Sequence, residues 1–582
     1  MIDNGMIYFA KSGTSSDDLK EKICLNPKMA NRHGFVCGAT GTGKTVTLKV
    51  LAESFSALGV PVFVSDVKGD VSGLLNAGTD SESMQKRIRR FDIADSFRYE
   101  GSPCTFYDIY GEKGIRLRTS VSEIGPILMS RILDLNETQS DLLSVVYKIA
   151  DDHGLLLVDT KDLKATLNFA YENSAELEME YGHIAKASVS AIVRSIVALE
   201  SEGADQFFGE PAIDIKDFFT VTPEGKGMIN VLDSESLINQ PRLYSAFMLF
   251  LLSELFEVLP EVGDPEKPKM VFFFDEAHLL FNNASQTLLE KVNQVVKLIR
   301  SKGVGIYFVT QSPSDIPNSV MSQLSNKIEH ALRAYTPAEL RALKAAADTF
   351  RVNPEFDTVT LLQELGTGEA IVSLLDEKGI PQVAQHAFIL PPMCSMDPIS
   401  EEERTASITG SSLYSKYGQT VDPDSAYEFL QRQKKMQEQE LEDMKSEAAE
   451  KKAQEEAEKE AQKAKEKEEK EAQKAAEKAE KEAQKAAEKA EKEAQKAAEK
   501  AEKEALKAQE KAAKEAEKAA KKKQNAVSQA AKSVSSTVTG TVGREVGKAI
   551  GGSIGGSFGK TLGGNIGSSL GRNIIGTLFK LK

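Results

Sequence analysis

Residues 38–45 read Gly38-Ala39-Thr40-Gly41-Thr42-Gly43-Lys44-Thr45, a complete G-x-x-x-x-G-K-T phosphate-binding loop. Its three glycines allow the backbone to curl until successive N–H groups face one point, where they can hold an anion. In this motif Lys44 reaches the β- and γ-phosphates of a nucleoside triphosphate, and the hydroxyl of Thr45 ligates Mg²⁺. The stretch 38–45 therefore predicts a site for ATP and Mg²⁺.

The sequence on either side of the loop supports this prediction. Phe35-Val36-Cys37 ends a short apolar run of the kind found in buried parallel strands. Residues 46–55 carry apolar side chains at helical spacing, so a helix should start at the loop and direct its positive N-terminal end at the phosphates. This strand-loop-helix order distinguishes the motif from a chance match in a glycine-rich loop.

Composition limits the classes of protein that fit. The 582 residues are too many for one ordinary domain, since domains usually hold about 100–200 residues. The net charge of −14 excludes a basic field over the whole surface, and so argues against nonspecific binding of nucleic acid by that surface. It is compatible with a locally positive pore enclosed by an acidic ring.

Cysteines and termini indicate a cytoplasmic protein. The cysteines at 24, 37, 104 and 394 form no C-x-x-C pair, so we expect reduced thiols and no zinc ribbon. Residues 1–5 lack the basic and apolar regions of a signal peptide. No stretch offers 18 uncharged apolar residues, so an ordinary membrane-spanning helix is not expected.

Residues 1 to about 400 have the composition of a globular domain of the α/β class. Strand-like apolar runs alternate with helical stretches, which predicts a parallel sheet with helices on both faces. After the run at 35–37, the expected strands are 60–66, 228–232, 270–274, 305–309 and 369–375. Strands are sparse between about 75 and 225, where the spacing predicts a mostly helical insertion.

The C-terminal third departs from globular composition. We expect a polar linker at 401–429, then a long helix at 430–525, a stretch built almost entirely of Ala, Glu, Lys and Gln with an eleven-residue repeat. That helix is either a coiled-coil stalk or a solitary charged helix.

In the tail, 526–582, glycines recur every four residues from Gly543 to Gly571. The tail fits close helix packing, attachment to a membrane surface, or a disordered glycine-rich segment.

Two acidic residues complete a hydrolytic site. Residues 272–274 form an apolar strand that ends in Asp275-Glu276. We expect Asp275 to hold the metal ion and Glu276 to polarise the attacking water. The alternative is that this pair only caps the helix that follows.

Five further residues are candidates for the site. Gln311 ends the 305–309 strand run, where its amide can contact both the γ-phosphate and the water. Asp66 and Asp70 follow the second strand, at the edge where such sheets bind ligands. Arg300 and Arg333 are candidates for an arginine that acts on the transition state from a neighbouring subunit.

These motifs together resemble the HerA/FtsK branch of P-loop ATPases, and most of all the HerA-like bacterial proteins without an N-terminal barrel. The stretches that carry the resemblance occur in order over residues 1 to about 400: 29–34, 39–48, 66–70, 275–278, 310–311 and 330–334. The resemblance implies a RecA-like core and a homo-hexameric ATPase ring that translocates double-stranded DNA, in HerA proper beside a partner nuclease. It also places Arg300 at the position of the trans-acting finger and Asp70 at that of a family acidic residue.

The sequence also departs from that family. Only 37 residues precede the loop, too few for the barrel that binds the nuclease, and no aromatic and basic segment for reading DNA is evident. Our main hypothesis is a hexameric DNA-translocating ATPase. The alternatives are a protein-handling or envelope-associated ATPase anchored through the C-terminal helix and tail, and a scaffold switched by ATP.

Overall fold

The computed structural model describes residues 1–281 and 286–498. The chain divides into a compact unit, Met1–Lys435, and a second unit that starts at Met436. The predicted glycine-rich tail, 526–582, and the last part of the predicted charged helix, 499–525, lie outside the described residues.

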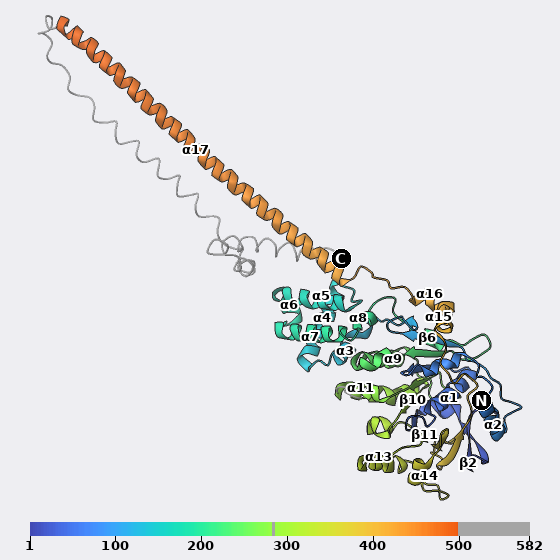
Figure 1. The fold of residues 1–582 in the computed structure, drawn as a ribbon. Helices are drawn as coiled ribbons and strands as arrows, with labels where there is room; N and C mark the ends of the chain where they lie inside the picture. The colour runs from blue at the N-terminus through green and yellow to red at the C-terminus, as the bar shows by residue number, and fades with distance from the viewer. Residues whose placement is uncertain (282–285, 499–582) are drawn as a thin grey trace. The chain divides into compact units, whose positions relative to one another are not determined.

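The compact unit is built on one large, mostly parallel sheet between helices, as the sequence predicted (Figure 1). The strands along the sheet follow the order β1-β2-β13-β12-β11-β4-β10-β9-β5-β8-β6-β7, and β3 pairs with β2. Their bounds are β1 Ile2–Asp3, β2 Met6–Ser15, β3 Asp18–Leu25, β4 Gly34–Cys37, β5 Val62–Asp66, β6 Cys104–Asp108, β7 Ile115–Arg116, β8 Ile229–Asp233, β9 Met270–Phe274, β10 Val304–Thr310, β11 Asn326–His330, β12 Glu369–Ser373 and β13 Gln385–Ile389.

The strands from β11 to β7 run parallel, whereas those from β12 to β1 are antiparallel. The sequence placed the 369–375 run in a parallel sheet, and that orientation is wrong. β12 follows β11 through α13 and α14 and then turns back along it, with Ile328 opposite Val372. β11 and the hairpin of β2 and β3 were not predicted from the sequence.

Helices cover both faces of this sheet. The helices of the described residues are α1 Lys44–Ala57, α2 Glu82–Phe91, α3 Val121–Ile132, α4 Glu137–His153, α5 Thr160–Glu172, α6 Ser174–Tyr181, α7 Lys186–Glu200, α8 Ala204–Phe207, α9 Pro241–Val258, α10 His278–Phe281, α11 Gln286–Ile299, α12 Asn318–Met321, α13 Pro337–Ala347, α14 Thr358–Glu364, α15 Glu401–Gly410, α16 Ser412–Tyr417 and α17 Ala426–Ala498. The short 3₁₀ helices are η1 Pro27–Arg32, η2 Asp70–Leu75, η3 Ile215–Phe219, η4 Ser236–Asn239, η5 Arg300–Lys302 and η6 Pro313–Asp315.

Alternate residues of the central strands enter two separate cores, as expected for strands buried on both faces. On β9, Phe272 and Phe274 pack in the core beneath α9 and α11, whereas Val271 and Phe273 pack in the core beneath α1. Figure 1 shows α1 on one side of the sheet and α9 and α11 on the other. This sandwich fixes the carboxyl ends of β4, β10, β9 and β5 side by side.

The helical insertion is narrower than the sequence predicted. The insertion was predicted over about 75–225, but helices α3 to α8 occupy only Val121–Phe207. The earlier part of the predicted segment contributes β6 and β7 to the main sheet. β6 pairs with β8, a strand more than a hundred residues away along the chain. Such a partner is invisible to a local pattern.

The segment 401–429, which the sequence suggested as a linker, contains α15 and α16 and the start of α17. Arg404 and Tyr417 are buried against the compact unit. The guanidinium of Arg118 donates to the Tyr417 carbonyl at 3.1 Å, and Ser425 Oγ donates to Asp162 Oδ1 at 2.7 Å. These few buried side chains thus attach the polar segment 401–429 to the rest of the compact unit.

Helix α17 is the described part of the predicted charged helix, and its residues from 436 on belong to the second unit. Among the described helices, none is by itself long and apolar enough to cross a membrane. One bent pair, α6 with α7, meets the length and composition criteria jointly, with an angle of 96° between its helices.

Candidate nucleotide site

The phosphate-binding loop lies between β4 and α1, at the carboxyl edge of the sheet. The amide of Gly38 donates to the Thr310 carbonyl at 3.3 Å, and that of Ala39 to the Ala331 carbonyl at 2.8 Å. These hydrogen bonds attach the loop to the ends of β10 and β11, the strands on either side of β4. Gly38 has a φ of 155°, and a Cβ there would lie 2.5 Å from the Cβ of His330, so only glycine fits.

Lys44 is the first residue of α1, and its side chain is buried within the loop. Its ammonium donates to the carbonyls of Gly38 and Ala39, at 2.5 and 3.1 Å. Burial, together with the positive charge of Lys68, lowers the pKa of Lys44. The cation is therefore confined to the mouth of the loop, where a phosphate can bind it.

Three carboxylates converge beside the loop. Phe274 is in register with Ser65, so Asp275 and Asp66 follow adjacent strand ends. Asp70 accepts a hydrogen bond from Thr45 Oγ1 at 3.1 Å, and its other oxygen is buried without a partner among the described residues. Burial and neighbouring carboxylates raise the pKa of both Asp66 and Asp275 to about 7.

The chemistry of these residues fits Mg²⁺. It prefers oxygen ligands and is usually bound through one or two carboxylates, waters and the phosphates of the substrate rather than by a complete protein cage. Thr45 and Asp275 provide such oxygens, and Asp70 accepts from the Thr45 hydroxyl through Oδ2 while its Oδ1 has no partner among the described residues. The described parts of the chain contain no group of three or more His, Cys, Asp or Glu side chains that could hold a metal ion among themselves.

Asp66, a candidate for the site from the sequence, accepts hydrogen bonds from its own turn. Its Oδ1 accepts from the amides of Lys68 and Gly69 at 3.3 and 2.8 Å, and its Oδ2 from the amide of Val71 at 3.1 Å. The carboxylate is thus occupied by its own turn. It shapes the segment that carries Lys68 and Asp70 to the site.

Glu276 is held in a strained backbone conformation, with a φ of 47°, and is almost fully buried. Its Oε1 accepts from Lys68 Nζ at 2.5 Å and from Gln311 Nε2 at 3.0 Å. Burial alone would raise the pKa of Glu276, but these two hydrogen bonds and the charge of Lys68 leave that pKa below its ordinary value. Glu276 is therefore ionised at neutral pH, the state required of a base.

Gln311 joins Glu276 to the loop. It follows β10, which lies between β4 and β9 in the sheet, so its side chain stands between the loop and Glu276. Its Nε2 donates to Glu276 and its Oε1 accepts from Thr40 Oγ1 at 3.2 Å. A change at the loop can thereby reach the carboxylate through one side chain.

Comparison with known families supports this interpretation of the fold. The profile of the family described as "Helicase HerA-like C-terminal" matches residues 11–482. The chain belongs to this family.

Among curated relatives, the DNA double-strand break repair helicase HerA of Sulfolobus acidocaldarius is 23% identical over 376 residues, which cover 61% of this chain and 64% of that protein. HerA of Saccharolobus solfataricus is 22% identical over 366 residues, 60% and 63% of the two chains. The aligned part thus spans slightly less than two thirds of these HerA proteins. Among solved structures, VirB4 of Thermoanaerobacter pseudethanolicus aligns with 15% identity and a TM-score of 0.42, over 67% of this chain and 97% of that one.

The two candidate arginines of this HerA-like chain lie at opposite edges of the sheet. Arg300 belongs to η5, before the amino end of β10, and donates to Asp264 Oδ1 at 3.1 Å. β10 has seven residues, about 23 Å of extended chain, and separates Arg300 from the loop edge. Arg333 follows β11 on the loop edge, and its guanidinium donates to the carbonyls of Gln363 and Leu365. Arg300 is thus too far away to act on its own loop.

His330 is a residue of the HerA-like site whose part the sequence did not reveal. Its ring is fully buried, with Nδ1 2.7 Å from the Glu369 carbonyl and Nε2 2.9 Å from Thr47 Oγ1. Burial lowers the pKa of His330 to about 4, so the ring is neutral, donates from Nδ1 and accepts from Thr47. It supports both the loop and the first turns of α1. The stretch 330–334 contributed to the family resemblance, but the contacts of His330 could not be predicted from it because its partners come from distant segments.

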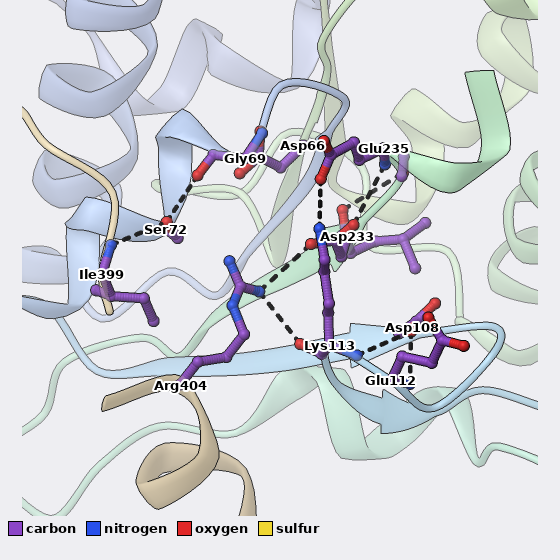
Figure 2. Close-up of polar contacts among 12 residues, drawn as sticks. Asp66, Gly69, Ser72, Asp108, Glu112, Lys113, Asp233, Glu235, Ile399 and Arg404 are labelled. Carbon is purple, nitrogen blue, oxygen red and sulfur yellow. Dashed lines mark hydrogen bonds and ion pairs between the residues drawn. The ribbon is translucent and has the colours of Figure 1, made fainter. Parts of the chain in front are cut away.

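A polar network extends the same edge beyond Asp66 (Figure 2). Asp233 ends β8 and is in register with Asp66. Arg404 of α15 donates to Asp233 Oδ2 at 3.4 Å and to the Lys113 carbonyl at 3.1 Å. Asp108 ends β6 and accepts from the Lys113 amide at 3.0 Å. These carboxylates are occupied within the fold, and they attach α15 to the sheet.

Proposed function

We propose that this protein is an ATP-hydrolysing motor that assembles as a hexamer and translocates double-stranded DNA. The observation that carries the proposal is the chain of contacts from Thr40 through Gln311 to Glu276. It links the phosphate-binding loop to an ionised carboxylate with hydrogen bonds of 3.2 and 3.0 Å. A site that only binds nucleotide has no need of this connection.

In the proposed hydrolysis, each residue acts through a group that the geometry supplies. Glu276 accepts the proton of the water that attacks the γ-phosphorus, and Gln311 orients that water. Lys44 and the loop amides bind the β- and γ-phosphates. Thr45 and Asp275 would hold Mg²⁺, which would supply charge neutralisation at the phosphates. Lys68 holds Glu276 in place until the water is bound.

The hexamer is supported by the position of Arg300. It lies at the edge of the sheet opposite to its own loop, so an arginine with a role in hydrolysis must reach the loop of a neighbouring subunit. We therefore propose Arg300 as the finger in trans. Arg333 lies on the loop edge of its own chain, where its guanidinium secures the 363–365 backbone.

DNA is the proposed track because the HerA relatives are named DNA double-strand break repair helicases. The test is ATPase activity of the full chain with and without duplex DNA. We expect stimulation by duplex DNA that weakens steeply as salt rises, as counterion release requires. Glu276→Gln should lose hydrolysis by about 10²- to 10⁴-fold while it retains ATP binding. Hydrolysis that DNA never stimulates would contradict the DNA part of the proposal.

The same variant separates this proposal from a scaffold switched by ATP, because the output of a scaffold would survive the loss of hydrolysis in Glu276→Gln. Unstimulated hydrolysis together with binding of the full chain to lipid vesicles would instead favour the envelope-associated or protein-handling alternative. A partner nuclease, as in HerA, remains a prediction that co-purification with the full chain would test.

A further inference from the structure

A cavity of about 190 Å³ opens behind the nucleotide site, on the face of the sheet away from α1. Phe35 of β4 and Glu329 of β11 line it from the sheet, and Ala342 and Ala346 of α13 line the opposite wall. We call it the Glu329 pocket. It is several times larger than the roughly 30 Å³ that one water molecule occupies.

The pocket contains a buried carboxylate without a partner. Glu329 is 1% exposed, and its Oε2 has no hydrogen-bond partner among the described residues. Buried polar groups are nearly always paired, so an unpaired one points to a missing ligand or to water. Burial raises the pKa of Glu329 to about 7, because the buried carboxylate has lost its hydration.

A cation, Lys327, lines the same pocket, and its charge offsets part of the effect of burial on the pKa of Glu329 without forming an ion pair with the carboxylate. Lys327 lies two residues earlier on the same face of β11, but its ammonium donates to the Thr349 carbonyl at 3.4 Å and stands 6.0 Å from the ring centre of Phe350. No ion pair within 4.0 Å joins Lys327 to Glu329. Cys37, on the neighbouring strand in register with Glu329, is a buried thiol whose pKa is raised well above its ordinary value, so it stays neutral.

These surroundings select the chemistry of a ligand. An anion is disfavoured by Glu329, and a single carboxylate with alanine walls offers too few ligands for a metal ion. The small side chains of Ala342, Ala345 and Ala346 line one wall of the pocket, which also contains the polar side chains of Ser314, Asn318, Lys327 and Thr349. We propose that the Glu329 pocket binds a slender organic cation, whose ammonium or guanidinium N–H groups donate to Glu329 and whose aliphatic body packs against α13.

The pocket also adjoins the proposed hydrolytic machinery. Pro313 and Ser314, which line it, follow Gln311 by two and three residues. Asp315 of the same turn accepts hydrogen bonds from Thr310 Oγ1 at 2.5 Å and from the Ser312 amide at 3.1 Å. A ligand against this turn should shift the position of Gln311 and change the rate of hydrolysis. This second part rests on the proposed function, whereas binding itself does not.

The test is calorimetric titration of the full chain with n-butylammonium chloride in the absence of nucleotide. A second titration uses n-butanol, an uncharged molecule with the same four-carbon chain. We expect saturable binding of the ammonium with Kd on the order of 1 mM or tighter, and none of the alcohol. Glu329→Gln keeps the size and removes the charge, so it should weaken binding at least about tenfold. Lys327→Gln, at the rim, is the matched control and should bind equally well or better.

Absence of saturation up to about 10 mM, or equal affinity of Glu329→Gln, overturns the site and leaves a pocket that holds water only. Thermal unfolding of each variant excludes loss of fold as the cause. The ATPase rate is then measured with the same probe. A change in kcat for the native protein but not for Glu329→Gln supports the coupling to Gln311. An unchanged kcat with binding intact overturns that coupling, and a chain without ATPase activity contradicts the proposed function while the binding result stands.

Discussion

Gln311→Leu tests the connection between the loop and the proposed base. Leucine keeps the bulk of the side chain but removes the 3.0 Å hydrogen bond to Glu276 and the 3.2 Å hydrogen bond from Thr40. A hydrogen bond to a charged group contributes about 1.5–3 kcal/mol. Because roughly 1.4 kcal/mol corresponds to a factor of ten in rate, we expect kcat to fall about 10- to 100-fold. The KM for ATP should change little, since Lys44 and the loop amides are untouched.

The same substitution should move the pH profile. The hydrogen bond from Gln311 contributes to the lowered pKa of Glu276, so its loss raises that pKa. A base is active when ionised, and kcat falls as the pH drops through its pKa. The acid limb of the kcat profile should therefore move to higher pH in Gln311→Leu. Steady-state ATPase assays across the acid range measure both effects.

Substitutions at Thr40 provide the matched controls. Thr40→Ser keeps the hydroxyl and should be close to native, whereas Thr40→Val loses only a neutral hydrogen bond and should lower kcat about two- to tenfold. An unchanged kcat in Gln311→Leu refutes the proposed connection. So does a loss that appears wholly in KM with the acid limb in place.

Two further predictions concern residues whose roles depend on distant partners. Arg300→Ala and Lys44→Ala should each abolish ATPase activity when assayed alone. Mixing the two variants should restore a part of the activity, because a native arginine from one subunit then meets a native loop in the next. No recovery at any mixing ratio would argue against a finger in trans. His330→Asn should reduce the pH dependence of the free energy of unfolding. In the native protein the pKa of His330 is about 4 in the folded chain and 6.5 ordinarily, so the unfolded chain binds a proton that the folded chain does not. The stability of the native protein therefore falls between pH 6.5 and pH 4. The native protein should lose about 3 kcal/mol more than the variant over that range, measured by denaturant unfolding, and parallel curves would contradict the buried neutral ring.

Local sequence was sufficient for the parts of the site that are contiguous. The loop at 38–45, the Asp275-Glu276 pair and Gln311 each follow an apolar run, and in a parallel sheet such positions meet at one edge. The structure places Gln311 between the loop and Glu276 because β10 is the neighbour of both β4 and β9. The sequence could suggest the residues, but not that one side chain touches both partners.

Other features depended on strand neighbours that are far apart in the chain. The orientation of β12, the pairing of β6 with β8, and the burial of His330 each arise from segments separated by tens to hundreds of residues. The helices at 401–417 were not predicted for the same reason, because Arg404 forms its ion pair with Asp233, a residue far away in the sequence. Polar composition predicts exposure when that partner is unknown.

By itself, the sequence determined the α/β class, the phosphate-binding loop and the residue types that a hydrolytic site needs, because backbone geometry and short-range periodicity encode them locally. Only the tertiary structure decided that Asp66 braces a turn, that Arg300 lies a strand's length from its own loop, and that Glu329 is buried without a partner. Those outcomes depend on strand order and on burial. Both are properties of the whole folded chain, since they arise from contacts between residues far apart in sequence.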